Sequence, residues 1–174
     1  HPQVFFLKEI PTLMVSFARS GNSPESIEAV RLANSYCDTI YHLVITCSKT
    51  GDLAQLAEET NVFTLILPEK SIDKSLAMTG SFTSMLLSVV LIGKLTNVEK
   101  YSYAVKSLCE SGIDILHRYI PLIRDISNTV YERVIFLGSG PLLGIARECH
   151  LKLQELTDGK IICKHDSFLG FRHG

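Results

Sequence analysis

The chain of 174 residues is long enough for one good-sized domain or two small ones. Its 17 Lys+Arg against 18 Asp+Glu give a net charge of −1, so its composition offers no electrostatic case for binding nucleic acid or an anionic membrane. The five cysteines are scattered and lack CxxC spacing, which favours reduced thiols in a cytoplasmic protein over disulfides or a zinc site. The sequence has no signal peptide, and its start at His1 and end at Gly174 suggest a piece of a longer protein.

The first strand and the turn after it form the most informative stretch. The apolar run over 12–15 predicts a buried strand, and Ser23 followed by Pro24 predicts the start of a helix. Between them, Gly21 permits positive φ or a close approach to a ligand, and the amides of the new helix favour an anion. Neighbouring side chains can add hydrogen bonds and charge: Arg19, Ser20, Asn22 and Ser23. The stretch is either a phosphate-binding loop or an ordinary strand-to-helix turn.

Strands and helices then alternate at the spacing of βαβ units. The predicted elements are a helix to about Cys37, a strand over 41–46, a short helix capped by Asp52 and ending near Glu59, and a strand over 62–67. This order predicts an α/β fold with a parallel sheet.

A long apolar segment and a long helix follow. The segment 76–95 has the length of a membrane span, but its small and hydroxyl residues favour a buried or dimer-interface helix. Residues 97–128 are predicted to be helical, broken near Gly112 and bent at Pro121, and to bridge two lobes. One side of this helix is apolar: Ile113, Leu116, Ile120 and Ile123.

A second strand, glycine-rich turn and helix begin near residue 133. We expect a strand over 134–137, a helix from Pro141 to about Thr157, and a further strand over 160–163. The repeat of the pattern at 12–36 and 133–157 suggests two similar α/β lobes.

The glycines of this second turn invite a dinucleotide-binding interpretation. However, the spacing of Gly138, Gly140 and Gly144 departs from the usual fingerprint. The acidic residue that the fingerprint requires is expected at the end of the next strand, and Asp166 comes late, past the predicted strand end.

The second helix carries three charged residues on one face. Glu148, Lys152 and Glu155 are spaced i, i+4 and i+7. They form either a solvated face with a modest ion pair or a catalytic group in which Glu155 moves a proton between adjacent sugar carbons.

Histidine positions offer one further candidate. His173 lies among glycines in a predicted loop, where it is either a surface residue or an acid–base group that opens a sugar ring. His42, His117 and His150 are assigned structural roles, and His165 is left open. No two histidines combine metal-ligand spacing with a carboxylate, so no metal is predicted.

Two segments together resemble the SIS (sugar isomerase) domain family. Ser16-Phe17-Ala18-Arg19-Ser20-Gly21-Asn22-Ser23-Pro24-Glu25-Ser26 is similar to its sugar-phosphate loop. Leu151-Lys152-Leu153-Gln154-Glu155-Leu156-Thr157 and Ser167-Phe168-Leu169-Gly170-Phe171-Arg172-His173-Gly174 resemble the second SIS domain of the tagatose-6-phosphate ketose/aldose isomerase group, also described as galactosamine-6-phosphate deaminases.

The resemblance implies a three-layer α/β/α fold with parallel sheets in two flavodoxin-like SIS lobes, each incomplete in this chain. The expected division is a first SIS domain over 1–96 without its opening strand, linking helices over 97–130, and the first part of a second SIS domain over 131–174. The family enzymes use neither metal nor nucleotide, so no cofactor is implied.

Site residues also carry over by position. The phosphate is expected on Arg19, Ser20, Gly21, Asn22 and Ser23. Glu155 matches the base that moves a proton between C1 and C2 of the sugar. Glu148 and Lys152 match residues that assist ring opening and hold the sugar. His173 matches the ring-opening histidine, which comes from a neighbouring subunit. A homodimer or larger even oligomer, without nucleic acid or membrane, is therefore implied.

The implied activity is an aldose–ketose isomerisation of a phosphorylated hexose or aminohexose, with loss of ammonia from galactosamine 6-phosphate. The alternatives are a plain tagatose-6-phosphate isomerase and a regulatory sugar-phosphate-binding module. Two positions depart from the family pattern. Ala18 stands where many SIS loops have serine, and Met78 replaces a serine of the second binding loop of the related glucosamine-6-phosphate synthase.

Overall fold

The computed structural model describes residues 4–56 and 61–173. The chain separates into two compact units, one comprising His1–Lys74 and Met78–Gly93, the other Ser75–Ala77 and Lys94–Gly174. The domain boundaries expected near residues 96 and 131 stay a prediction.

The first unit is built on a parallel sheet. Its strands are β1 (Thr12–Ala18), β2 (Ile40–Thr46) and β3 (Val62–Ile66), paired in that order. Thr12 lies opposite Ile40, and His42 lies opposite Val62. The helices are α1 (Pro24–Tyr36), α2 (Asp52–Gln55) and α3 (Gly80–Ile92), with a 3₁₀ turn at Glu69–Ser71.

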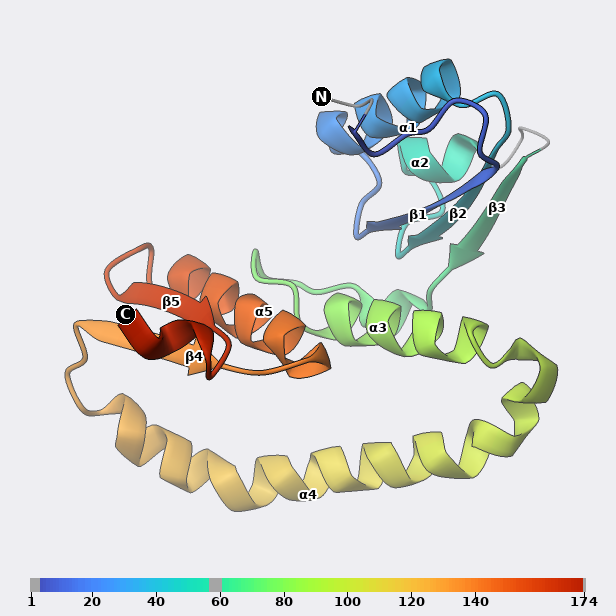
Figure 1. Cartoon of the computed structure of the whole chain (residues 1–174). Coiled ribbons are helices and arrows are strands. Elements are labelled where there is room, and N and C mark those ends of the chain that lie inside the picture. The colour runs from blue at the N-terminus through green and yellow to red at the C-terminus, as the bar shows by residue number, and fades with distance from the viewer. Residues whose placement is uncertain (1–3, 57–60, 174) are drawn as a thin grey trace. The chain divides into compact units, whose positions relative to one another are not determined.

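Helices cover both faces of this sheet (Figure 1). Val30 of α1 and Leu53 of α2 pack against Val44 on one face. On the other face, Met85 of α3 packs against Ile45. Because consecutive strand residues point to opposite faces, β2 contributes to both cores. The first unit therefore confirms the predicted three-layer α/β/α arrangement, and the apolar segment 76–95 supplies a core helix.

Two helix starts test the capping predictions. The first is confirmed, because α1 begins at Pro24 with Ser23 in the extended N-cap conformation. The second is wrong: the N-cap of α2 is Gly51, and Asp52 lies in the first turn. The end predicted near Glu59 lies outside the described residues.

The start of α3 is capped by a residue that lies outside the helix. Asp73 accepts hydrogen bonds from the amides of Gly80 (2.7 Å) and Ser81 (3.1 Å), and from the hydroxyls of Thr79 (2.9 Å) and Ser81. The Ser81 hydroxyl, assisted by Thr79 and the two amides, holds the pKa of Asp73 well below its usual range against the opposing effect of burial. A carboxylate at this position also suits the positive end of the helix dipole.

Asp73→Asn is expected to lower the free energy of unfolding at pH 7 by about 1 kcal/mol, the usual cost of a lost cap. Since the folded-state pKa is lowered, the stabilisation is complete above the unfolded-state value of about 3.9 and is lost as the pH falls below it. The free energies of unfolding of wild type and Asp73→Asn, measured with urea between pH 3 and 7, should therefore approach each other as the pH falls. Asp38→Asn, at an exposed position after α1, is the control. A constant difference across this range would contradict the capping role.

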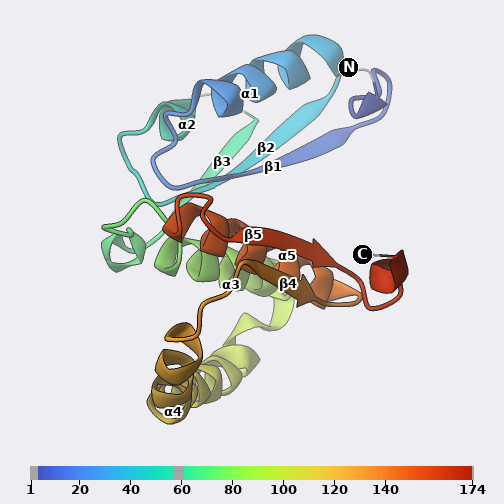
Figure 2. The ribbon, with the colours of Figure 1, turned by 90° about the vertical axis from the view of Figure 1, so that its left-hand side faces the viewer.

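The second unit contains a smaller parallel sheet. Its elements are a 3₁₀ segment (Leu95–Tyr101), α4 (Ser102–Ser127), β4 (Arg133–Leu137), α5 (Pro141–Leu156), β5 (Ile162–Asp166) and a 3₁₀ turn (Gly170–His173). The first residue of β4, Arg133, lies opposite Ile162 of β5. Figure 2 shows α5 running alongside both strands, which it contacts.

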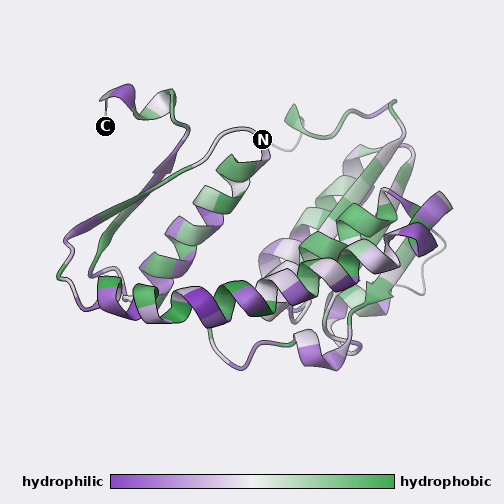
Figure 3. Ribbon diagram, turned by 90° about the horizontal axis from the view of Figure 1, so that it is seen from below, coloured by the Kyte–Doolittle hydropathy of each residue, from purple (hydrophilic) through white to green (hydrophobic). Residues whose placement is uncertain are grey.

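Helix α4 runs without interruption through Gly112 and Pro121. The predicted break at Gly112 is wrong, because one glycine costs a helix only about 1 kcal/mol and this helix is 26 residues long. Figure 3 shows apolar and polar residues alternating along it, and Ile113, Leu116 and Ile123 are exposed within their unit.

The described residues include no single helix long and apolar enough to cross a membrane. Gly80–Ile92 and Leu95–Ser127 pass that test of length and composition only when they are taken together.

The position of Asp166 also differs from expectation. It is the last residue of β5, not a residue beyond the strand. Its carboxylate accepts a hydrogen bond from the Ser167 amide (2.7 Å) and so shapes the next turn. The case against a dinucleotide fingerprint therefore rests on the glycine spacing. Gly138 itself is required by packing, because an added Cβ would lie 2.3 Å from the carbonyl oxygen of Leu142.

Candidate functional site

The 19–23 loop joins the carboxyl end of β1 to α1. Its central residue, Gly21, has φ of +76°, so the predicted need for a glycine is confirmed. Gly21 is buried, whereas Ser20, Asn22 and Ser23 are exposed. The loop thus presents hydroxyl and amide groups to solvent at the edge of the sheet where ligands of open α/β folds bind.

Two hydrogen bonds tie the 19–23 loop to α2, and a third forms within the loop. The Leu53 amide donates to the carbonyl oxygen of Gly21 (3.0 Å). The Asp52 amide donates to Oδ1 of Asn22 (2.9 Å), and the Asn22 amide donates to Oγ of Ser20 (3.3 Å). Asn22 therefore shapes the loop by accepting through its Oδ1, and the nitrogen of its side-chain amide takes no part in this bond.

The backbone of Gly51 packs closely against the 19–23 loop. A Cβ added there would lie 1.9 Å from the carbonyl oxygen of Ser20 and 3.2 Å from Oδ1 of Asn22. Sequence analysis missed this residue. The available signal was a glycine between a predicted strand and a predicted helix, which does not reveal the distant segment it contacts.

A pocket of about 570 Å³ opens at the carboxyl ends of β2 and β3. Its polar lining includes Ser48, Lys49 and Thr50, in the segment between β2 and α2. The two departures from the family pattern lie in packing positions, since Ala18 and Met78 both pack against hydrophobic core clusters.

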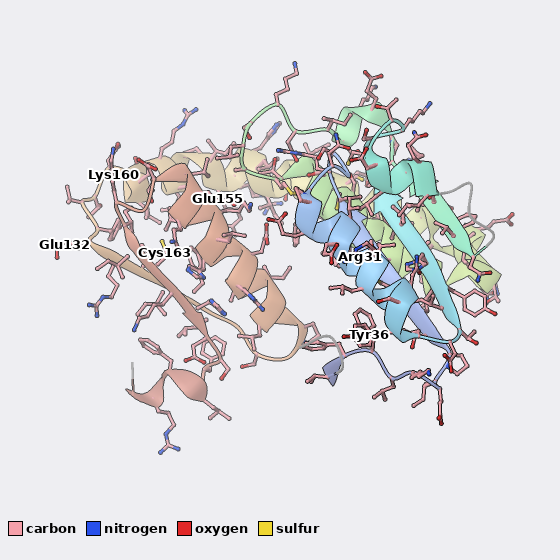
Figure 4. All side chains as sticks on the ribbon, turned by 90° about the horizontal axis from the view of Figure 1, so that it is seen from above. Arg31, Tyr36, Glu132, Glu155, Lys160 and Cys163 are labelled. Atoms are coloured by element: carbon pink, nitrogen blue, oxygen red, sulfur yellow. The ribbon has the colours of Figure 1, made fainter. Side chains whose placement is uncertain are left out.

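A separate candidate feature, in the second unit, is a charged row on α5. The ammonium of Lys152 lies 2.6 Å from Oε2 of Glu155 and 3.5 Å from Oε1 of Glu148. All three side chains are partly buried, with exposed fractions of 16% for Lys152, 24% for Glu148 and 31% for Glu155. Figure 4 labels Glu155 on α5 and Lys160 in the turn beyond the helix.

This geometry favours a functional row over a solvated face. An exposed i,i+4 pair contributes only about 0.3–0.5 kcal/mol and does not require burial. Here one ammonium bridges two half-buried carboxylates, which fixes the position of both. An oriented carboxylate beside a fixed positive charge can abstract a proton α to a carbonyl and stabilise the charge that develops.

The histidines differ in their surroundings. His42 is buried, and its Nε2 lies 2.7 Å from Oδ1 of Asn34, in agreement with a structural role. His117 is exposed on α4, and His150 contacts His165. The backbone of His173 ends the last 3₁₀ turn, and its side chain lies outside the described residues.

Within residues 4–56 and 61–173, no group of three or more His, Cys, Asp or Glu side chains could hold a metal ion. The predicted site residues fall into two groups. Glu148, Lys152 and Glu155 lie together in the second unit, and the 19–23 loop belongs to the first.

Comparison with known proteins gives consistent results. No family model matches the chain. The chain is 43% identical over 175 residues to the D-galactosamine-6-phosphate deaminase AgaS of Shewanella sp. (strain ANA-3), covering 100% of the chain and 44% of that protein. A candidate tagatose-6-phosphate ketose/aldose isomerase from Clostridium novyi NT superposes with a TM-score of 0.96 at 45% identity. The match covers 100% of this chain and 45% of the Clostridium chain. The tagatose-6-phosphate ketose/aldose isomerase of Escherichia coli superposes with a TM-score of 0.86 at 38% identity. The match covers 100% of this chain and 47% of the Escherichia coli chain.

The fold, the 19–23 loop and the charged row therefore define an α/β protein of the SIS class. Within that class, the chain belongs to the group that contains these tagatose-6-phosphate ketose/aldose isomerases and galactosamine-6-phosphate deaminases. It spans less than half the length of the relatives that it matches.

Proposed function

We propose that the full-length protein carrying this chain is a sugar-phosphate aldose–ketose isomerase that converts galactosamine 6-phosphate to tagatose 6-phosphate with loss of ammonia. The observation that carries the proposal is the row in which Lys152 bridges Glu148 and Glu155. The name of the Shewanella relative supports the choice of an amino sugar.

The proposed roles follow from the two half-sites. The 19–23 loop binds the phosphate through Arg19, the hydroxyls of Ser20 and Ser23, and backbone amides. Glu155 moves the proton from C2 to C1 through an enolamine. Glu148 and Lys152 hold the sugar and assist ring opening.

Ring opening is assigned to His173 of a neighbouring subunit. A homodimer or larger even oligomer with shared sites is therefore part of the proposal, as is the division into domains at 1–96, 97–130 and 131–174. All five cysteines are free, which supports a reducing compartment, and we place the protein in the cytoplasm.

A second candidate is plain isomerisation of tagatose 6-phosphate without loss of ammonia. It is favoured by the names of the Clostridium and Escherichia coli structures. Both candidates use the same base and the same phosphate loop, and they differ in the substituent at C2 of the sugar.

The test is to incubate the full-length protein with galactosamine 6-phosphate and to follow ammonia and tagatose 6-phosphate together. Equal amounts of both products would support the proposal, and glucosamine 6-phosphate serves as the matched sugar of opposite configuration at C4. Interconversion of tagatose 6-phosphate with an aldose phosphate, without ammonia, would favour the second candidate. Binding of these sugars without either reaction would contradict both and favour a regulatory module.

A further inference from the structure

Two histidine side chains meet between α5 and β5. The imidazole rings of His150 and His165 are close to parallel, with centroids 5.0 Å apart and an angle of 24° between their planes. Their Nδ1 atoms lie 2.9 Å apart. On its other side, Nε2 of His150 lies 3.1 Å from Oε1 of Gln154.

With both imidazoles neutral and Oε1 of Gln154 facing Nε2 of His150, as the structure places it, these contacts assign the protons of the pair. The Oε1 atom of Gln154 accepts only, so Nε2 of His150 is the donor of that bond. A neutral imidazole carries one N–H, and Nδ1 of His150 is then an acceptor. The proton between the two Nδ1 atoms therefore belongs to His165, and Nε2 of His165 is left with a lone pair.

This lone pair has no hydrogen-bond partner among the residues that the structure describes. His165 lines a pocket of about 330 Å³, together with Gly144, Arg147, Glu148, His150 and Leu151. The charged groups of this pocket are the Arg147 guanidinium and the Glu148 carboxylate, and the latter is held by Lys152. A free imidazole base thus shares a pocket with one end of the charged row.

We propose that His165 is the acid–base group for the loss of ammonia, with His150 and Gln154 as positioning residues that fix its tautomer. The inference rests on the proposed function. Proton transfer between C1 and C2 of an amino sugar leaves a protonated ketimine at C2, which water must hydrolyse. Plain aldose–ketose isomerisation has no such step, so it does not require an acid–base group at His165.

The step balances with water as the only co-reactant. The water oxygen bonds to C2, its proton passes to Nε2 of His165, and the C=N electron pair moves onto nitrogen. The imidazolium then returns the proton to the amino nitrogen. As the C2–N bond breaks, the C2 hydroxyl becomes the carbonyl, and the hydroxyl proton leaves with ammonia as ammonium.

The test is His165→Asn in the full-length protein. The asparagine amide can replace the Nδ1–H that donates to His150, but it provides no base at the position of Nε2. General acid–base groups contribute about 10²–10⁴-fold, so we expect ammonia release from galactosamine 6-phosphate to fall by at least about 10²-fold. Interconversion of tagatose 6-phosphate and its aldose phosphate should stay within about threefold of wild type, which also reports that the variant is folded.

Two further variants sharpen the result. Gln154→Leu should also lower the ratio of ammonia release to isomerisation, but by less than His165→Asn does. The reason is that His150 loses the acceptor that fixes its tautomer. His117→Asn, at an exposed position on α4, is the control that should leave both rates unchanged. An equal fall in both reactions in His165→Asn, or no fall in either, would overturn the inference. Failure of the proposed function would appear separately, as wild-type protein that releases no ammonia.

Discussion

Glu155→Gln is expected to lower both ammonia release and aldose–ketose interconversion by about 10²–10⁴-fold, because glutamine cannot accept the proton from C2. The amide oxygen of glutamine can still accept a hydrogen bond from Lys152, whose ammonium lies 2.6 Å from Oε2 of Glu155. The charged row should therefore keep its geometry while it loses its base. Initial rates for both reactions, measured at saturating sugar phosphate, give the effect on kcat.

Binding provides the second measurement for this variant. The 19–23 loop belongs to the other compact unit, so calorimetry should show sugar-phosphate affinity within about threefold of wild type. Glu132→Gln, at an exposed position just before β4, is the matched control and should leave both rates unchanged (Figure 4). Wild-type turnover by Glu155→Gln would show that the base lies elsewhere.

Gly51→Ala should have the largest structural effect of any single substitution considered for the first unit. The new Cβ would lie 1.9 Å from the carbonyl oxygen of Ser20, and neither partner is the end of a flexible side chain. Backbone must move, so we expect a loss of about 1–3 kcal/mol in the free energy of unfolding. The displaced 19–23 loop should also lose most of its affinity for sugar phosphate.

The control for this substitution is Gly112→Ala, which should change the free energy of unfolding in the opposite direction. A Cβ added at Gly112, in the middle of α4, would meet nothing within 4 Å. Gly112→Ala should therefore raise the free energy of unfolding by about 0.5–1 kcal/mol, since alanine is the better helix former. Urea unfolding of both variants decides the matter, and a Gly51→Ala protein of wild-type stability and affinity would contradict the close packing of the loop.

Local sequence patterns predicted the features that depend on neighbouring residues. Apolar runs bounded by turn residues located the strands of the first unit, and Ser23-Pro24 located the start of α1. Helical spacing alone placed Glu148, Lys152 and Glu155 on one face. Each of these inferences needs a window of only a few residues.

Features that depend on distant residues were missed or wrong. Asp73 caps a helix that begins seven residues later, and Gly51 packs against a loop 30 residues earlier in the chain. His165 could not be assigned because its contact with His150 joins α5 to β5 and cannot be seen in a local window of sequence. The predicted break at Gly112 failed for a different reason: propensity at one residue was outweighed by the rest of a long helix.

The hydrogen bonds from α2 to the 19–23 loop have a consequence for affinity. Both donors, the amides of Asp52 and Leu53, belong to a helix that follows β2 directly. The loop therefore acquires its shape when the βαβ unit folds, before any ligand arrives. A phosphate that binds there need not order a mobile segment, so less of its interaction energy is lost to conformational entropy. Preorganisation of this kind suits a site that must hold one end of a sugar still while the other end reacts.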